Sequence, residues 1–362
     1  MGDKAEKSHD SSPSRTEHKG NMDITFESPT PCSQVNEVQF YIHPQETVSE
    51  TLIPNLQRHL PYSNPIYNRM LAPQNTPSRH CLFAATFPPY GPVPEIYTII
   101  FSDRSRKTES QIWVFNPLIT PSYPQPLSQE YTSLLTIHLK MLLQFLKGTV
   151  ILEAPGHPFH PILKFACLHE IITDTLSTLL QSHCQSQSTS SSVIAHHTRW
   201  NLYLIPTTLF AIPLSRDSQP SFTISRVPPE HIHLVVSTSS IPREPSTLLA
   251  QPSFCLLNSE REMIAWAFIG IDGTLATLYV QPSYRGQGLA TYIARLLVHR
   301  LGCGEFRDLG FTGESGWVHA DVKEGNSGSE GVMRALRGKR SWVSSYFWVD
   351  CEGLDFWHGS MD

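Results

Sequence analysis

Two glycines, at positions 286 and 288, stand between an apolar segment and a helical pattern, and this combination can bind phosphate. Residues 275–280 (LATLYV) are apolar and β-rich, which predicts a buried strand, and Pro282 cannot continue its ladder. Apolar residues then recur at helical spacing over residues 289–301. A helix that begins in such a turn directs unpaired N–H groups and the positive end of its dipole at one point, which favours an anion.

The turn itself, residues 285–290 (RGQGLA), differs from the two common phosphate loops. No Gly-Lys-Ser/Thr follows it as in a Walker loop, and Thr291 occupies the position of the third glycine of GxGxxG. It resembles the pyrophosphate-binding turn of the GNAT acyltransferase superfamily, Gln/Arg-x-x-Gly-x-Gly/Ala, whose three fixed positions are Arg285, Gly288 and Ala290 here. An ordinary strand-to-helix turn is the alternative interpretation.

A second segment carries the same resemblance. Residues 318–336 (VHADVKEGNSGSEGVMRAL) are similar to the fifth strand of the superfamily, followed by an Asn and, three positions later, a small residue, which are Asn326 and Ser329 here. The resemblance covers residues 227–350, where the pattern predicts the order β-β-β-α-β-α-β. Within the superfamily, this region is most similar to the glycine N-acyltransferase branch, whose members place a degenerate GNAT-like half before the catalytic half.

The resemblance implies a co-substrate, acetyl-CoA or another acyl-CoA, and no metal. An amine would attack the thioester directly, and the acceptor would be the amine of a small molecule, a peptide or a protein. Backbone amides of the turn and the charge of Arg285 would hold the pyrophosphate, while a strand edge would pair with the pantetheine amides. The predicted cofactor-binding residues are Leu278, Tyr279, Val280, Arg285, Gly286, Gln287, Gly288, Leu289, Ala290, Asn326 and Ser329.

Two residues are candidates for the catalytic base. Asp321 stands five positions before Asn326, where several members of the superfamily carry an acidic base. His319, two positions before Asp321, lies on the same strand face because side chains alternate. Both also fit half-buried polar strand residues. The tyrosine that often protonates the leaving thiolate is Met333 here, and the acidic residue of the glycine N-acyltransferase branch is Thr274. The alternative function is therefore a catalytically weak or inactive acyl-CoA-binding or scaffold protein.

Further residue groups have weaker chemical interpretations. A basic cluster after position 333 fits either a 3′-phosphate site or a solvated helix end. Aromatic residues on the predicted strands fit either an acceptor pocket or core packing. The HExxH metal motif is incomplete, because Thr173 replaces its second histidine. The basic residues are Arg334, Arg337, Lys339 and Arg340, and the aromatic ones are Trp266, Trp342, Tyr346 and Trp348.

Composition limits the class of protein. The 27 Lys and Arg residues against 32 Asp and Glu residues give a net charge of −5, which excludes nucleic acid as an expected partner. Seven cysteines without a CxxC pair predict reduced thiols in the cytoplasm, with the nucleus as the alternative. No apolar segment approaches the ~18 residues of a membrane span, and the N-terminus lacks the apolar core of a signal peptide, so we expect a soluble protein without a membrane partner.

The pattern along the chain predicts an α/β fold in two lobes. Polar residues 1–35 predict a disordered tail. Residues 36–184 predict a smaller or degenerate α/β domain, with strands at 81–87, 95–103, 111–118 and 149–153 and helices at 128–146 and 161–182. Residues 185–198 are rich in Ser and Gln and predict a linker. Residues 199–362 predict a GNAT-type mixed sheet flanked by helices. The expected strands are at 200–213 (a strand or a hairpin), 253–258, 263–269, 274–280, 317–322 and 341–349, and the helices at 289–301 and 326–336.

Overall fold

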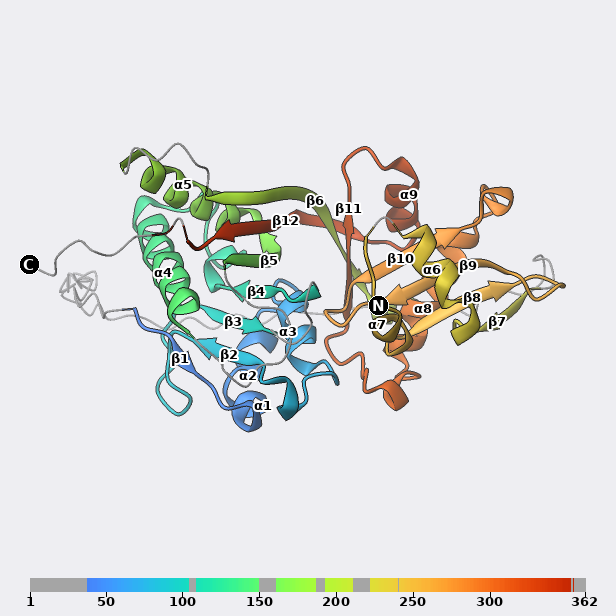
Figure 1. Cartoon of the computed structure of the whole chain (residues 1–362), viewed down its shortest axis with the longest axis horizontal. Coiled ribbons are helices and arrows are strands. Elements are labelled where there is room, and N and C mark those ends of the chain that lie inside the picture. Colours follow the sequence, from blue (N-terminus) through green and yellow to red (C-terminus); the bar gives the residue numbers. More distant parts are fainter. Residues whose placement is uncertain are drawn as a thin grey trace, which may run out of the picture. The chain divides into compact units, whose positions relative to one another are not determined.

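The described part of the chain forms two β-sheets, one of eight strands and one of four. This computed structural model describes residues 38–103, 109–149, 161–186, 193–210, 222–239, 241–352 and 354. Both sheets have helices packed against them, as Figure 1 shows, which confirms the predicted α/β class. Among the described helices, none has both the length and the apolarity that a membrane crossing requires.

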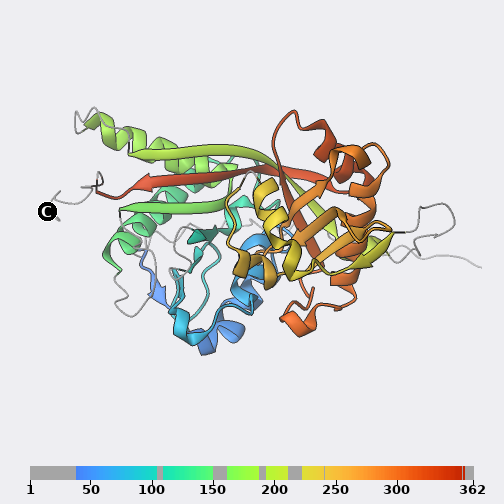
Figure 2. The same cartoon turned by 45° about the vertical axis from the view of Figure 1, so that its right-hand side comes forward.

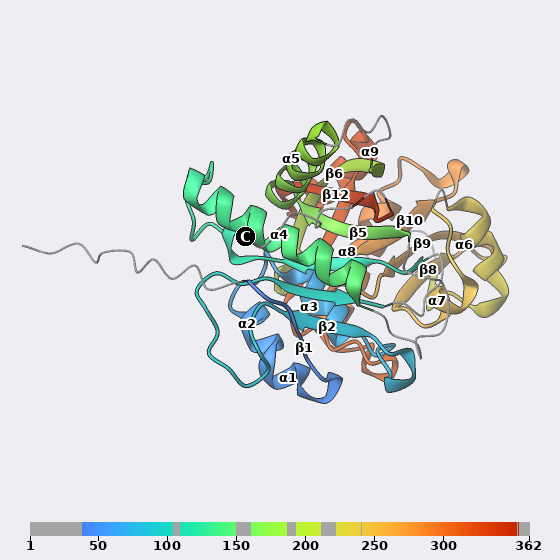
Figure 3. The same ribbon diagram turned by 60° about the vertical axis from the view of Figure 1, so that its left-hand side comes forward.

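The first lobe contains β1 (Tyr41–Ile42), β2 (Leu82–Ala85), β3 (Ile99–Ser102), β4 (Ile112–Phe115), β5 (Ile162–His169) and β6 (Ile194–Pro206). Its helices are α1 (Val48–Thr51), α2 (Ile53–Gln57), α3 (Asn64–Leu71), α4 (Gln129–Gly148) and α5 (Glu170–Ser186). The first four strands pair in order as an antiparallel set, and β4 meets β5 in parallel at one residue pair. Figure 3 shows α4 lying across these strands, and its apolar face joins their core. The three predicted strands and the α4 helix are confirmed.

The segment after α4 corrects one prediction. A helix was expected over 161–182, but Ile162–His169 is a strand and α5 begins only at Glu170. A short apolar run fits a buried strand and a buried helix equally well. The choice is made by pairing with the last strand of the chain, where Phe165 opposes Phe347 and Leu168 opposes Ser345. The predicted strand at 149–153 lies outside the described residues except for Thr149, which ends α4.

The second lobe contains β7 (Thr223–Ser225), β8 (Ser253–Leu257), β9 (Met263–Ile269), β10 (Leu275–Val280), β11 (Trp317–Val322) and β12 (Lys339–Asp350). Its helices are α6 (Ile232–Thr238), α7 (Pro245–Leu249), α8 (Leu289–Gly302) and α9 (Ser327–Ala335). The small sheet has the order β10-β9-β8-β7 and is antiparallel throughout. Helix α8 buries its apolar face against this sheet, in a core that also contains Val318, Ala320 and Val322 of β11. The predicted order β-β-β-α-β-α-β is confirmed for β8 to β12.

The last strand of each lobe lies next to a strand of the other lobe. The large sheet has the order β1-β2-β3-β4-β5-β12-β6-β11, so β12 lies between β5 and β6, and β6 lies between β12 and β11. Figure 2 shows β6 and β12 running side by side, in agreement with their long antiparallel register. Both lobes thus have the same succession of elements, β2-β3-β4-α4-β5-α5-β6 and β8-β9-β10-α8-β11-α9-β12. The tail, linker and domain limits expected from the sequence remain predictions, although residues 194–198 of the expected linker are strand.

Strands β10 and β11 touch at a single point and then diverge. One isolated parallel bridge joins Thr274 to His319, and beyond it β10 belongs to the small sheet and β11 to the large one. The two crossovers of the lobe share β11, but the sheet between β10 and β11 is not continuous. The divergence of the two strands creates the space in which the predicted site residues lie. Short 3-10 helices complete the described chain at Gln45–Thr47, Pro77–Arg79, Pro117–Ile119, Thr207–Phe210, Pro229–His231, Pro282–Tyr284 and Arg307–Leu309.

Candidate functional site

Helix α8 begins without a side-chain cap. Its N-cap is Gly288, which has a left-handed backbone (φ 76°), and no side chain accepts a bond from its first turn. In contrast, Ser128 caps α4 and Asn326 caps α9 with their own oxygens. A Cβ built on Gly286 or Gly288 would meet no atom within 4 Å, so the turn is open and not filled by side chains. The N–H groups at the start of α8 are therefore available to an external anion.

A cavity of about 540 Å³, which we call the turn cavity, opens at this point. Its wall comes from the end of β10, the turn before α8 and the first residues of α9. Every predicted cofactor-binding residue except Gln287 lines it. Arg285 lies at its edge, where Nε donates to the carbonyl of Val280 (3.0 Å) and the guanidinium lies over the ring of Tyr279. The structure thus brings together residues that the sequence grouped only by motif.

A second cavity of about 330 Å³, which we call the splay cavity, lies between β10 and β11. It is lined by Thr274–Tyr279 of one strand and Ala320–Val322 of the other, with Met333 and Tyr346. The turn and splay cavities share Leu278, Tyr279 and Ser329, so they are neighbours along β10. Of the four predicted aromatic residues, Trp266 and Tyr346 line the splay cavity, while Trp342 and Trp348 do not. None of the four predicted basic residues lines either cavity.

Strand β10 is distorted where it faces both cavities. Its register with β9 shifts between Ala276 and Tyr279, and Thr277 between them has a positive φ of 53°. A β-branched residue rarely adopts that conformation, so the surrounding contacts must hold it there. The shift interrupts the pairing of Thr277 and Leu278 with β9. A backbone whose pairing is interrupted in this way has polar groups to offer to a bound molecule.

Asp321 receives hydrogen bonds from two strands of the large sheet besides its own. Ser344 Oγ donates to Oδ1 (2.7 Å), and Tyr346 OH (3.0 Å) and Cys167 Sγ (3.5 Å) donate to Oδ2. Burial, together with Cys167 and the nearby carboxylates, raises the pKa of Tyr346 well above its usual value, so its hydroxyl remains a donor. Asp321 lines the splay cavity, and the three donors fix the orientation of its carboxylate there.

His319 lies beneath the cavity wall, fully buried, and both of its ring nitrogens have partners. Asn68 Nδ2 donates to the backbone carbonyl of Asn64 (3.0 Å) and to its Oδ1 (2.8 Å), so Asn64 presents its NH2 group to His319 Nδ1 (3.3 Å). Nδ1 is therefore the acceptor, and Nε2 is the nitrogen that carries a proton. That proton points to Thr274 Oγ1 at 2.8 Å.

Asp272 is the last member of this chain of hydrogen bonds. Thr274 donates to its Oδ1 from both Oγ1 (2.5 Å) and the backbone N–H (3.1 Å). Burial by itself would raise the pKa of Asp272, but His319, the two bonds from Thr274 and the charge of Arg243 together lower it below its usual value. Asp272 is thus held as a carboxylate at the junction between β9, β10 and β11.

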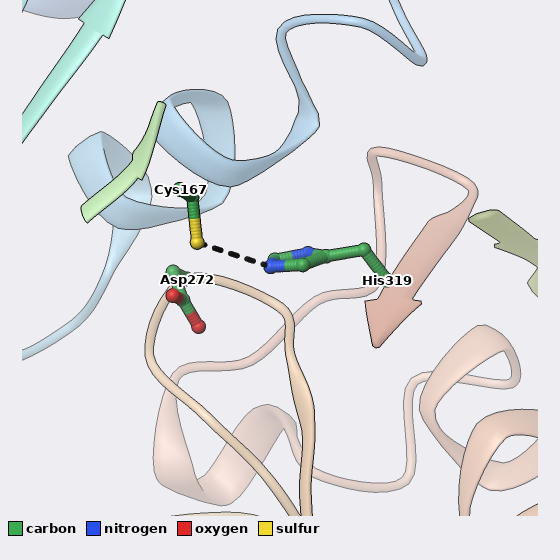
Figure 4. A group of neighbouring side chains, drawn as sticks. All are labelled: Cys167, Asp272 and His319. Carbon is green, nitrogen blue, oxygen red and sulfur yellow. Dashed lines mark hydrogen bonds between the residues drawn. The ribbon is translucent and has the colours of Figure 1, made fainter. Parts of the chain in front are cut away.

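Cys167, Asp272 and His319 form the cluster drawn in Figure 4, with their side-chain ligand atoms all within 4.8 Å of one another. A metal on His319 Nε2 would place the ring proton on Nδ1, where metal-bound histidines donate to an acceptor, but the NH2 group of Asn64 occupies that side. Burial, with Asp321 and Asp272 nearby, raises the pKa of Cys167 well above its usual value. The hydrogen bonding as it stands therefore fits neither a metal site nor an activated thiolate.

Asn64, Cys167 and Asp272 are neighbours of the site that were not predicted from the sequence. Asn64 and His319 are 255 positions apart, and Cys167 and His319 are 152 apart. No local motif connects residues at such separations. The one available signal, a polar residue inside an apolar strand run, is weak for Cys167 because cysteine is among the residue types most often buried.

Comparisons with known proteins give one family match and several similar structures. Residues 36–203 match the family model of the acyl-CoA N-acyltransferase verG N-terminal domain. An X-ray structure of a Drosophila protein is similar over 86% of this chain and 98% of its own, with a TM-score of 0.57 and 14% identity. A GCN5-related N-acetyltransferase from Sphaerobacter thermophilus covers 86% of this chain and 96% of its own, with a TM-score of 0.41 and 10% identity. No curated protein sequence matches the chain.

The fold and the match together define the class. The protein is a two-lobed α/β protein in which each lobe repeats the same element order, and its first lobe, including most of β6, matches an acyl-CoA N-acyltransferase domain. Over residues 36–203 the chain is similar to an acyl-CoA N-acyltransferase domain, and its likeness to the Drosophila structure concerns the fold.

Proposed function

We propose that the protein transfers an acyl group from acyl-CoA, most simply acetyl-CoA, to an amine that binds in the splay cavity. The single observation that carries this proposal is the adjacency of the two cavities along β10. At one end lies the uncapped start of α8, and at the other lies the carboxylate of Asp321. The shared residues Leu278, Tyr279 and Ser329 mark where the thioester would pass from one cavity to the other.

The nucleotide end of the donor is assigned to the turn cavity. The free N–H groups of α8 and the charge of Arg285 complement a pyrophosphate, which is a dianionic acceptor of hydrogen bonds. The pantetheine arm carries amides that complement the interrupted edge of β10. Asn326 also has a structural role, because its Oδ1 caps α9 by accepting from Ser329 N–H (3.1 Å). Its contribution to donor binding is therefore to position the start of α9 at the cavity wall.

Asp321 is assigned as the general base, since an amine must be neutral to attack a carbonyl carbon. Its carboxylate lines the splay cavity and is oriented by three donors. His319, the second candidate of the sequence analysis, is assigned a positioning role instead. It is fully buried, Nδ1 accepts from Asn64 and Nε2 faces Thr274, so neither nitrogen is free to take a proton from an amine.

A second candidate function is binding of acyl-CoA without transfer. The observation that favours it is Met333, which lies on the wall of the splay cavity where the resemblance places the proton-donating tyrosine. A thiolate is a good leaving group, so this substitution alone does not abolish transfer.

The test has two measurements on the full chain. Thermal unfolding with and without CoA reports donor binding, because a ligand that binds only the folded state stabilises it. Release of free thiol from acetyl-CoA, with a panel of small amines and peptides, reports transfer. We expect CoA to protect the protein and Asp321→Asn to lower kcat by about 10²-fold or more. Asp174→Asn, an exposed carboxylate paired with Arg199, is the matched control.

Each negative outcome has a distinct meaning. Protection by CoA without thiol release from any amine would favour the binding protein. Absence of protection would remove the donor site. Full activity of Asp321→Asn, with protection intact, would remove Asp321 as the base.

A further inference from the structure

The proposed transfer produces a thiolate, and the structure offers a proton donor for it that the motifs do not contain. Met333 has no proton to give, although it lies on the wall of the splay cavity. Three other hydroxyl groups of that wall donate to partners elsewhere, and no side-chain hydrogen bond is described for Thr277, Tyr279 or Ser329. Thr274 donates to Asp272, Thr238 donates to backbone carbonyls and Ser239 donates to the carbonyl of Ile241.

Tyr346 differs from these residues in its partner. It lines the splay cavity, and its hydroxyl donates to Asp321 Oδ2 at 3.0 Å. Among the described contacts, it is the hydroxyl group of the cavity wall that bonds to the proposed base. Asp321 and Tyr346 therefore form a pair in which a proton taken at the carboxylate can move to the phenol oxygen.

The local backbone explains how Tyr346 reaches this position. The register between β12 and β5 shifts between Ser345 and Phe347, and Cys167 on the facing strand has a positive φ of 52°. Such an irregularity interrupts the regular alternation of side chains between the two faces of the sheet. Here it brings Cys167 Sγ to 3.8 Å from the Tyr346 hydroxyl, and both groups point to Asp321 Oδ2.

We infer that Tyr346 is a catalytic residue that gives its proton to the departing CoA sulfur, and that Asp321 then restores that proton. This inference rests on the proposed function, since it names the acid of the same reaction. It assigns to β12 of the second lobe a role that the sequence resemblance places on α9.

The proposed step conserves atoms and charge. The amine nitrogen forms a bond to the thioester carbon, and the carbonyl oxygen takes the electron pair of the C=O bond. When that pair returns, the C–S bond breaks and its electrons leave on sulfur. Asp321 takes one N–H proton from the attacking amine, Tyr346 gives its hydroxyl proton to sulfur, and the proton on Asp321 passes along the existing hydrogen bond to the phenol oxygen. The products are an amide and CoA with a free thiol, and both residues return to their initial state.

The electrostatic surroundings keep the Tyr346 hydroxyl protonated before the transfer. Burial, Cys167 and the nearby carboxylates raise the pKa of Tyr346 well above its usual value, so its proton leaves only as Asp321 supplies another to the phenol oxygen. A donor of this kind is fully protonated throughout the range in which enzymes are ordinarily assayed.

The experiment compares the wild-type chain with Tyr346→Phe and with fluorotyrosines placed at position 346, which keep the shape of the side chain and lower the pKa of the phenol stepwise. Thiol release from acetyl-CoA is measured against pH with one amine on which the wild type is active. Tyr97→Phe is the matched control, since it also removes a buried hydroxyl, which bonds to the Asn55 carbonyl in the first lobe. Protection by CoA verifies that each variant is folded and binds the donor.

We expect Tyr346→Phe to lower kcat by about 10²-fold with the KM for acetyl-CoA changed less than about threefold. The fluorotyrosines should retain activity at neutral pH and show an alkaline limb that moves to lower pH as fluorines are added. Tyr346→Phe with unchanged kcat, or an alkaline limb that does not move, would overturn the inference while the proposed function stands. A wild-type chain that transfers no acyl group to any amine would overturn both.

Discussion

Thr274 and His319 are joined twice, by the isolated β-bridge between β10 and β11 and by the hydrogen bond between Thr274 Oγ1 and His319 Nε2 (2.8 Å). These two contacts lie at the point where the small and large sheets separate. Thr274, at the position where the sequence resemblance expects an acidic residue, thus fixes the vertex of the splay cavity. The position is structural in this chain, and the chemistry is assigned to Asp321.

Thr274→Val should destabilise the protein. The change removes Thr274 Oγ1, which accepts the His319 proton and donates to Asp272 Oδ1. The buried His319 and the half-buried Asp272 each lose a hydrogen bond. Such a loss costs about 1–3 kcal/mol in the free energy of unfolding, measured by urea denaturation. Thr274→Ser keeps the hydroxyl and is the control. Equal stability of the Val and Ser variants would show that the hydrogen bond does not hold the vertex.

Gly288→Val should abolish protection by CoA. At φ 76° a β-branched residue is strained, and its side chain would project into the open space before the N–H groups of α8. We expect a rise of about 2–5 °C in the midpoint of thermal unfolding for the wild type with saturating CoA and less than about 1 °C for the variant.

The control for this change is Gly316→Val, at another glycine with a left-handed backbone (φ 71°) and no atom within 4 Å of a built Cβ. It carries the same strain but does not line the turn cavity. If Gly288→Val keeps full protection, the phosphate site lies elsewhere.

Local patterns and distant contacts differ in how well the sequence predicted them. The strand, turn and helix around Gly288 were predicted correctly because their signals lie within a few residues: apolar spacing, glycines and a proline. The segment 162–169 was predicted as helix because nothing local indicates its pairing with β12. The contact between Asn64 and His319 could not be predicted for the same reason, since it depends on how the two lobes meet.

Burial makes stability depend on pH through His138 and His169. Burial lowers the pKa of each to about 4, against an ordinary value of 6.5. Between pH 6.5 and 4 the unfolded chain binds a proton more readily than the folded one, so this stability is complete above pH 6.5 and is lost as the pH falls.

We expect each histidine to contribute a loss of about 2 kcal/mol in the free energy of unfolding between pH 7.5 and pH 5.0. His138→Gln should reduce the pH dependence by about that amount, and His233→Gln, at an exposed histidine, is the control. An identical pH dependence for wild type and His138→Gln, measured by urea denaturation, would contradict the assignment.

Asn64 determines which ring nitrogen of His319 carries the proton, and Asn64→Asp should reverse it. The new carboxylate would accept from Nδ1–H and leave the lone pair of Nε2 facing Thr274 Oγ1 at 2.8 Å and Cys167 Sγ at 3.9 Å. Cys167, Asp272 and His319 would then offer one sulfur, one oxygen and one nitrogen ligand with an acceptor behind the histidine, a set that suits Zn²⁺. We expect zinc to raise the thermal midpoint of Asn64→Asp but not of the wild type.

Asn64→Asp combined with Cys167→Ser is the control, and it should lose the zinc effect. If zinc stabilises the wild type equally and Cys167→Ser abolishes that effect, the Asn64 side-chain amide flips readily and the cluster binds metal as it stands.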